Sequence, residues 1–210
     1  MELWINEIEK TMEQIKEYEY VDLGLPSGLK WATMNIGAEI ETDYGDYFMW
    51  GSIEPNTPEE CTWTNVPFNN GLSLFGREYF SSIKDTVYPN GVLAKEYDAA
   101  AQIMGSGWRM PTQTEWQELL NNTTNEWATI NGVSGRKFTS KINGNSIFIP
   151  AAGRCNDGSV NSVGSYGNVW SSSLNTSNPN GAWGLDFTSG NCHMNYLSRY
   201  FGRSVRGVRN

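Results

Sequence analysis

The side chains best suited to chemistry are few, and two of them are neighbours near the C-terminal end of the chain. Cys192 precedes His193, the only histidine, while Cys61 and Cys155 lie far away in the sequence. An odd number of scattered cysteines predicts no disulfide framework and supplies no C-x-x-C pair for zinc or redox chemistry. One histidine gives little basis for a histidine metal site or a histidine-dependent triad. We therefore expect no catalytic site, no metal and no cofactor.

A segment of unsorted, contact-rich residues surrounds this Cys-His pair. Asn191–Phe201 mixes aromatic, thiol, imidazole and amide groups and follows neither the period of a strand nor that of a helix. It lies between two strand-like stretches, Ala182–Thr188, whose alternation predicts one buried face, and Gly202–Arg209. A core strand would sort its residues by face, and a plain solvent loop would contain fewer large apolar groups. We interpret 191–201 as a displayed binding surface.

The predicted contact residues combine large flat side chains with adaptable polar ones. Tyr196 and Tyr200 offer contact area at low entropic cost, and His193 offers hydrogen bonds. For Phe201 and Leu197, burial in the core is an open alternative. The predicted ligand-binding residues are Cys192, His193, Met194, Asn195, Tyr196, Leu197, Ser198, Tyr200 and Phe201, bordered by Asn156, Asp157, Asn168 and Val169.

Length, charge and the N-terminal sequence narrow the classes of function. With 210 residues and 22 glycines, the chain is expected to form one loop-rich domain over 20–210, preceded by a helix over 1–19. A net charge of −8 argues against general binding to nucleic acids or anionic membranes. No stretch has the length of a transmembrane helix, and MELWINEIEK lacks the features of a signal peptide. We expect no membrane insertion and no secretory address.

The N-terminal helix carries a short heptad seam. Ile5, Ile8, Met12 and Ile15 recur at spacings of 3, 4 and 3 residues. Two heptads are marginal as an isolated coiled coil, so two interpretations stay open. The helix either packs on its own domain or forms an oligomerisation stem. Isoleucine at several seam positions would favour more than two strands, and a homotrimer is the assembly expected in that case.

Turn, capping and charge signals predict the other features. The predicted elements are a hairpin turning at Pro26–Gly28, an aromatic strand over Tyr44–Gly51, packed loops over 61–92, a helix over Glu96–Met104, a helix from the capping box Thr112–Glu115 to Asn121–Asn122, strands over Lys137–Ile142 and Ser146–Pro150 with a turn at Asn143–Asn145, and a strand over Val169–Ser173. The clustered C-terminal arginines favour internal ion pairing over a phosphate site. They are Arg199, Arg203, Arg206 and Arg209.

Several stretches resemble one protein family in the order in which they occur. They are VDLGLPSGLKWATMNIGA (21–38), YGDYFMWG (44–51), GWRMPTQTEWQELL (107–120), GNSIFIPAAGR (144–154), GSYGNVWSSS (164–173) and FGRSVRGVR (201–209). Over most of its length the chain resembles the Fibrobacter succinogenes major paralogous domain of Bacteroidetes, which is related to the formylglycine-generating-enzyme branch of the C-type lectin fold. The resemblance implies an α+β, C-type lectin-like fold, with two helices packed on twisted antiparallel strands and loops gathered on one face.

The C-terminal part is similar, more narrowly, to the variable proteins of diversity-generating retroelements and to the phage major tropism determinant. In these proteins a reverse transcriptase rewrites adenines near the 3′ end of the gene, which implies a variable face over 155–201. Template Asn codons can become any codon ending in a pyrimidine, and within 191–201 only Met194 has no such codon. The resemblance implies a receptor-binding protein of a phage tail or bacterial surface, with a protein or glycan receptor as partner. The alternative is a constant adhesin or glycan-binding module of the same family.

Two other activities associated with this fold find little support in the residues. Formylglycine-generating enzymes hold a metal with paired cysteines and oxidise a substrate thiol, but Cys192 has no cysteine near it in the sequence. Glu54-Pro55-Asn56 matches a sugar-binding tripeptide of calcium-dependent lectins. Because the companion Trp-Asn-Asp motif is absent, we interpret this match as chance.

Overall fold

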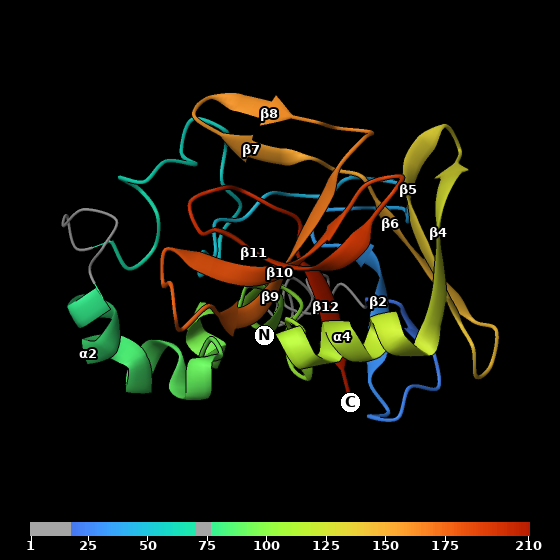
Figure 1. Ribbon diagram of the computed structural model, residues 1–210, viewed down its shortest axis with the longest axis horizontal. Coiled ribbons are helices and arrows are strands. Elements are labelled where there is room, and N and C mark those ends of the chain that lie inside the picture. The colour runs from blue at the N-terminus through green and yellow to red at the C-terminus, as the bar shows by residue number, and fades with distance from the viewer. Residues whose placement is uncertain (1–17, 70–76) are drawn as a thin grey trace, which may run out of the picture.

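The computed structural model describes residues 18–69 and 77–210, which form a mixed, strand-rich α+β structure (Figure 1). The described helices are α2 (Arg77–Val87), α3 (Ala99–Ile103) and α4 (Gln113–Asn122), with 3-10 turns η1 (Pro89–Gly91) and η2 (Lys95–Tyr97). The strands are β1 (Tyr20–Asp22), β2 (Lys30–Asn35), β3 (Trp108–Arg109), β4 (Thr123–Ile130), β5 (Val133–Ser140), β6 (Ser146–Pro150), β7 (Arg154–Asn156), β8 (Ser159–Asn161), β9 (Gly167–Leu174), β10 (Gly181–Phe187), β11 (Cys192–Ser198) and β12 (Arg206–Arg209). The predicted N-terminal helix, with its seam from Ile5 to Ile15, lies outside the described residues.

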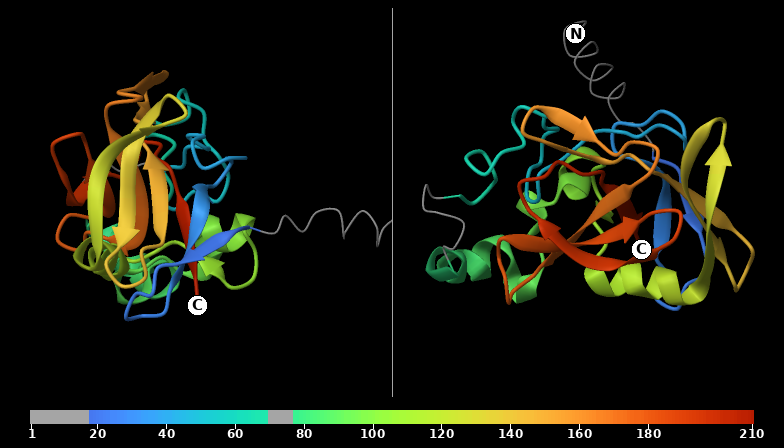
Figure 2. Two further views of the ribbon diagram at one scale, coloured as in Figure 1. Left: turned by 90° about the vertical axis from the view of Figure 1, so that its right-hand side faces the viewer. Right: turned by 45° about the horizontal axis from the view of Figure 1, so that its top comes forward.

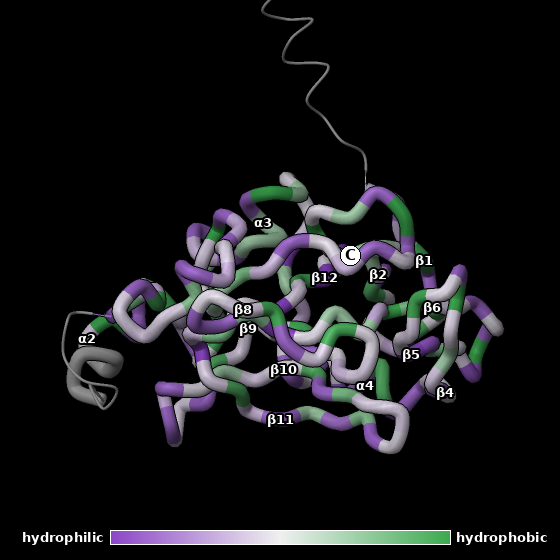
Figure 3. The backbone as a smooth tube through the Cα atoms, turned by 90° about the horizontal axis from the view of Figure 1, so that it is seen from above, coloured by the Kyte–Doolittle hydropathy of each residue, from purple (hydrophilic) through white to green (hydrophobic). Residues whose placement is uncertain are grey.

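The strands form antiparallel sheets around a central one. The central sheet has the order β11-β10-β9, and Figure 1 shows α4 beneath it and the β7–β8 hairpin above it. The β4-β5-β6 sheet lies at the right-hand side of the molecule in Figure 1 and faces the viewer in the left panel of Figure 2. Seen from above, β11 lies at one face of the molecule, and β2 and β12 of the β1-β2-β12-β3 sheet lie toward the opposite face (Figure 3). Within the described part of the chain, no helix has the length and apolar composition that spanning a membrane would require.

Local signals predicted several elements correctly. The first hairpin turns just before Gly28, which adopts a φ of +74° and donates its amide to the Leu25 carbonyl at 2.8 Å. Helix α4 begins with the predicted capping box. The Thr112 hydroxyl accepts the Glu115 amide at 3.3 Å, and the Glu115 carboxylate accepts the Thr112 amide at 2.7 Å. Strands β6 and β9 also lie where the sequence predicts strands.

Three stretches differ from the predictions. Tyr44–Gly51 is extended but bridges to another segment only between Phe48 and Arg203 among the described residues, so it is not a regular strand. Helix α2 falls inside the region predicted to be loops. Strand β4, which the sequence did not reveal, follows α4 directly and pairs with β5 along its whole length. β4 is rich in polar residues, and its pairing with β5 decides its conformation.

Asp98 makes α3 shorter than predicted and joins it to β3. Its carboxylate caps the helix by accepting the Ala101 amide at 2.9 Å, so the helix begins after Asp98 and not at Glu96. The same carboxylate accepts the Met110 amide at 2.8 Å, just beyond β3. Burial raises the pKa of Asp98, and these backbone hydrogen bonds act in the opposite direction. One buried carboxylate therefore fixes the position of the helix relative to the strand.

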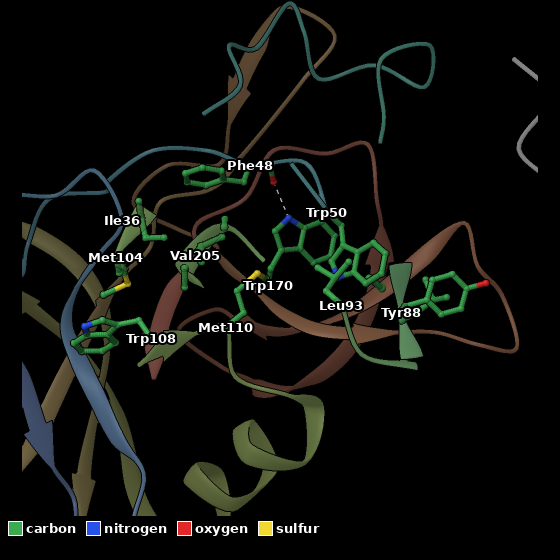
Figure 4. Close-up of a cluster of buried hydrophobic side chains, with 14 of the residues drawn as sticks. Ile36, Phe48, Trp50, Tyr88, Leu93, Met104, Trp108, Met110, Trp170 and Val205 are labelled. Atoms are coloured by element: carbon green, nitrogen blue, oxygen red, sulfur yellow. Dashed lines mark hydrogen bonds between the residues drawn. The ribbon is translucent and has the colours of Figure 1, made fainter. Parts of the chain in front are cut away.

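Aromatic side chains fill the core on both sides of the central sheet. Figure 4 shows the cluster around Trp170 on one of these sides. Trp170 of β9 donates its indole N–H to the Phe48 carbonyl at 2.7 Å, and Trp50 donates to a β9 carbonyl at 3.0 Å. On the side of α4, the rings of Trp116 and Trp31 lie 4.6 Å apart. Every residue of β9 is buried, and β10 is buried except at its third residue. The single buried face predicted for β10 is therefore wrong, because its small residues are covered too.

The two most buried C-terminal arginines do not form the ion pairs that the sequence predicted. No carboxylate of the described residues lies within ion-pair distance of Arg203 or Arg206. Arg206 donates to the side-chain oxygen of Asn35 at 3.0 Å and to the carbonyls of Ala32 and Phe148 at 2.9 and 3.0 Å. Burial lowers the pKa of Arg206 to about 9, which still leaves the guanidinium positively charged at neutral pH. The three oxygens stabilise this charge by hydrogen bonds. Arg203 is held instead by aromatic rings.

Replacing Glu115 tests the junction between α4 and β3. Burial acts to raise the pKa of Glu115, but hydrogen bonds from Arg109 at 2.6 and 2.7 Å and from Thr112 outweigh it and lower the pKa. Because the folded-state pKa lies below the unfolded value, this stabilisation is present above the unfolded pKa and is lost as the pH falls through the folded one. Glu115→Gln is expected to lower the free energy of unfolding by about 1–3 kcal/mol at neutral pH.

Urea denaturation over a range of pH measures this effect. The difference between wild type and Glu115→Gln should narrow as the pH is lowered toward about 2. Glu126→Gln, on the exposed side of β4, is the matched control and should change stability by less than about 0.5 kcal/mol. A difference for Glu115→Gln that is independent of pH would contradict the assigned role.

Candidate functional site

The segment predicted to be a non-periodic binding surface is a strand at the edge of the central sheet. Cys192–Ser198 pairs with β10 in an unbroken antiparallel register, from Cys192 opposite Phe187 to Ser198 opposite Gly181. The segment is a regular strand although its apolar residues do not follow a period of two, so the inference that it is not a strand is wrong. The inward side chains change face along the strand, which hides the alternation in the sequence.

Three of the predicted contact residues on β11 pack against the core. Cys192 and Met194 share a face with their cross-strand partners in β10 and pack on the cluster beside α4. Leu197 points to the other face and belongs to the Trp170 cluster, with only 8% of its surface exposed. Leu197 is therefore a core residue, and the prediction that it contacts ligand is wrong. Burial raises the pKa of Cys192 to about 11, which keeps it a protonated thiol near neutral pH and makes it a poor nucleophile.

Other residues of β11 face solvent and form the first part of the candidate site. His193 is exposed, and Tyr196 is 52% exposed, with its ring edge-to-face against Trp183 at 6.2 Å. Asn195 is half-buried and donates to the Asp186 carboxylate at 3.2 Å. We call the exposed and half-buried residues His193, Asn195, Tyr196 and Ser198 the strand patch. Because side chains alternate along a strand, His193 and Asn195 lie on one face of this edge strand, and Tyr196 and Ser198 lie on the other.

The buried Asp186 carboxylate holds Asn195 of the strand patch by a hydrogen bond and is itself bound by a second donor. Tyr166 donates its hydroxyl to this carboxylate at 2.5 Å, on the same oxygen that accepts Asn195. Burial, followed by the hydrogen bond to Asp186, raises the pKa of Tyr166, so the phenol stays a donor over the neutral pH range. Two donors on one buried carboxylate hold Asn195 in a defined orientation.

Aromatic rings form the second part of the candidate site, at the turn after β11. Tyr200 stacks on Trp63 with ring centroids 4.5 Å apart, and Phe201 follows at 4.2 Å from Tyr200. Phe201 lies between two guanidinium groups, Arg154 at 5.0 Å and Arg203 at 5.1 Å. We call Trp63, Tyr200 and Phe201 the aromatic patch.

Arg203 lies beneath Phe201 of the aromatic patch and near the Tyr166–Asp186 pair that holds Asn195. Its guanidinium is fully buried and lies 4.6 Å from the ring centroid of Trp170. Burial, followed by the nearby charge of Arg154, lowers the pKa of Arg203 to about 9, while Tyr166 and Asp186 act in the opposite direction. Its Nε and Nη1 atoms have no hydrogen-bond partner among the described residues. Aromatic faces therefore provide much of its stabilisation.

The four predicted bordering residues divide into two groups. Asn168 and Val169 lie in β9 and are each 1% exposed, so their prediction as surface residues is wrong. Asn156 and Asp157 lie at the tip of the β7–β8 hairpin, where Asp157 is exposed and Asn156 half-buried. Burial raises the pKa of Tyr200, and the nearby Asp157 carboxylate adds to this effect. The hairpin tip therefore borders the aromatic patch, as the sequence predicts.

Several members of the site have no signal in the sequence that marks them as binding residues. Trp63 comes from a loop far from the C-terminal segment, and Tyr166 comes from the loop before β9. The alternation of Ala182–Thr188 places Trp183 on the predicted buried face, yet Trp183 is partly exposed beside Tyr196. Only the pairing of β10 with β11 and the packing of 61–69 against 199–202 bring these rings to the site.

The arrangement suits binding through aromatic contact and hydrogen bonding. Within residues 18–69 and 77–210, no group of three or more His, Cys, Asp or Glu side chains is placed to hold a metal ion. Comparison of the chain with protein-family models, with curated proteins and with solved structures finds no match. The C-type lectin-like fold and the retroelement resemblance therefore stay predictions.

Two adjacent residues of β11 test the division between displayed and core positions. Leu197→Ala should lower the free energy of unfolding by about 2–5 kcal/mol, because it leaves a cavity in the Trp170 cluster. Tyr196→Ala should lower it by less than about 1 kcal/mol, because it removes mainly solvent-facing area and one ring contact. Urea denaturation of both variants measures the difference. Similar losses of unfolding free energy in the two variants would show that Tyr196 is packed as tightly as Leu197 and is not a displayed residue.

Proposed function

We propose that this chain is a non-enzymatic ligand-binding protein in which a C-type lectin-like scaffold displays a retroelement-diversified surface. The ligand-binding surface consists of the strand patch, which lies within the proposed variable segment, and the aromatic patch, to which Trp63 contributes a ring from outside that segment. The observation that carries the proposal is the division of β11, whose solvent-facing positions lie on a sheet that is otherwise buried. Replacing such side chains leaves the core contacts of the sheet intact, which is the property that a variable surface requires.

Met194 provides an independent argument for diversification. Its residue type is the one within 191–201 that cannot arise from a template Asn codon, and its side chain packs inward opposite Leu185. His193 and Tyr196, on either side, have compatible codons and face solvent. The correspondence is incomplete, since Cys192 and Leu197 have compatible residue types and also contact the core. A fixed residue at an inward position nevertheless supports the proposal.

The exposed and half-buried side chains of this surface indicate the kind of ligand. Tyr196 and Tyr200 present large rings with few rotatable bonds, and His193, Ser198 and the Asn156–Asp157 tip present hydrogen-bonding groups. Such a surface suits a protein or glycan receptor on a cell surface, with the chain carried on a phage tail or bacterial surface. If residues 1–19 form a trimeric stem, three weak sites would act together and increase avidity.

Two displayed libraries of the full chain test whether this surface tolerates change. One library randomises His193, Tyr196 and Ser198, and the matched library randomises Met194, Leu197 and Arg199, which face inward or are buried. Most clones of the first library should stay folded, and selection against an unrelated probe protein such as lysozyme should enrich binders. Clones of the second library should lose folded display, because their changes fall in the core.

Poor display of a clone can reflect low expression and not loss of folding. Thermal unfolding of purified random clones from each library distinguishes the two. Equal loss of folding in the two libraries would contradict a displayed surface. Failure of the first library to yield any binder, despite folded clones, would contradict its use in recognition.

One observation favours a second function, a constant glycan-binding module. Trp63, which stacks on Tyr200, lies far upstream of the proposed variable region, so one of the three rings of the aromatic patch is fixed. A fixed flat ring suits stacking against a sugar. In this case Trp63→Ala should abolish binding on a glycan array, Tyr196→Ala should preserve it, and the gene should lack a neighbouring template. A near-copy template mismatched mainly at adenines, beside a reverse transcriptase gene, would instead favour diversification.

A further inference from the structure

Two buried cysteines from distant parts of the chain meet beneath the aromatic patch. Cys61 and Cys155 are 94 positions apart in the sequence, yet their Sγ atoms lie 3.0 Å from each other and neither side chain is exposed. Met49 and Val66 complete this small apolar cluster, and Trp63 and Tyr200 of the aromatic patch pack against it. The two sulfur atoms are in direct contact, about 1 Å farther apart than in a disulfide.

Backbone pairing holds both cysteines in this position. The Asp157 amide donates to the Cys61 carbonyl at 3.1 Å, which attaches the 51–69 loop to the β7–β8 hairpin. Cys155 and Gly202 exchange two backbone hydrogen bonds, of 2.9 and 2.8 Å. A Cβ atom at Gly202 would lie 2.2 Å from the Cys155 sulfur and 2.7 Å from the Cys61 sulfur. Only glycine at 202 leaves room for the two thiols to face each other.

We propose that Cys61 and Cys155 form a disulfide that fastens the loop carrying Trp63 to the hairpin and turn carrying Asp157 and Tyr200. The sequence predicted no disulfide, because nothing in the spacing of three cysteines indicates this contact. The disulfide would close a long loop of the chain, and closure of a long loop removes much conformational freedom from the unfolded state. It does not depend on the ligand proposed above.

Thiol–disulfide exchange with a small-molecule disulfide such as oxidised glutathione supplies the oxidant. The Cys155 thiolate attacks one glutathione sulfur, and the S–S bond of glutathione breaks to release one glutathione thiolate. The Cys61 thiol gives its proton to that thiolate and attacks the Cys155 sulfur, which releases the second glutathione thiolate. The protein loses two electrons and two protons, and one glutathione disulfide becomes two thiols. Once the two sulfurs have met in the folding chain, the hydrogen bond from Cys61, then backbone hydrogen bonds and then the Arg203 charge lower the pKa of Cys155, against the effect of burial.

The test refolds the full chain from urea in glutathione buffers, because both thiols are buried in the folded state. After alkylation under denaturing conditions, mass spectrometry should find a Cys61–Cys155 linked peptide and one alkylated cysteine, Cys192. The midpoint of thermal unfolding should rise by about 5–15 °C over the same sample treated with dithiothreitol. Cys192→Ala should keep this reductant-dependent shift, and Cys61→Ala and Cys155→Ala should each lose it.

Each variant is compared with itself in oxidised and reduced form, so a general loss of stability does not obscure the result. Alkylation of all three cysteines after refolding in oxidised glutathione would overturn the proposal. A linked peptide that contains Cys192, or a reductant-dependent shift that survives Cys155→Ala, would overturn it as well.

Discussion

Stabilisation of the buried Arg203 guanidinium is the constraint on which the candidate site depends. A desolvated cation is costly unless other groups compensate, and here the rings of Trp170 and Phe201 face it at 4.6 and 5.1 Å. The backbone of Arg203 also exchanges hydrogen bonds of 2.9 and 3.0 Å with Phe48. The chain that returns from β11 is thereby fixed to the middle of the molecule. Phe201, although partly exposed, contributes to this stabilisation and is less free to change than Tyr196.

The position of β11 at the edge of its sheet explains how one strand combines core and displayed residues. It pairs with β10 alone among the described strands, so no second strand constrains its outward side. Its inward side chains use both faces of the sheet, Met194 on one and Leu197 on the other. An edge strand normally risks pairing with another chain. Here the inward anchors fix its register to β10, and the exposed positions are left for polar and aromatic groups.

Sequence reasoning succeeded where a few neighbouring residues determine the conformation. Thr112 and Glu115 predict the start of α4, and Gly28 predicts the first turn, because capping and positive φ are local requirements. It failed where contacts between distant segments decide. The inward side of β11 changes face, so the alternation of Cys192–Ser198 is invisible to a period count. The buried arginines were expected to meet carboxylates, but carbonyls and rings surround Arg203 and Arg206.

The two patches differ in how they are supported, which gives them different capacities for change. Side chains of the strand patch rest on regular backbone pairing, which does not depend on their identity. Tyr200 instead rests on Trp63, a residue of another segment, so a change at one ring alters the support of the other. Under the proposed function, the strand patch is therefore the part in which variation disturbs the fold least. The aromatic patch is better suited to contribute a constant contact area, against which a changing strand patch would select the ligand.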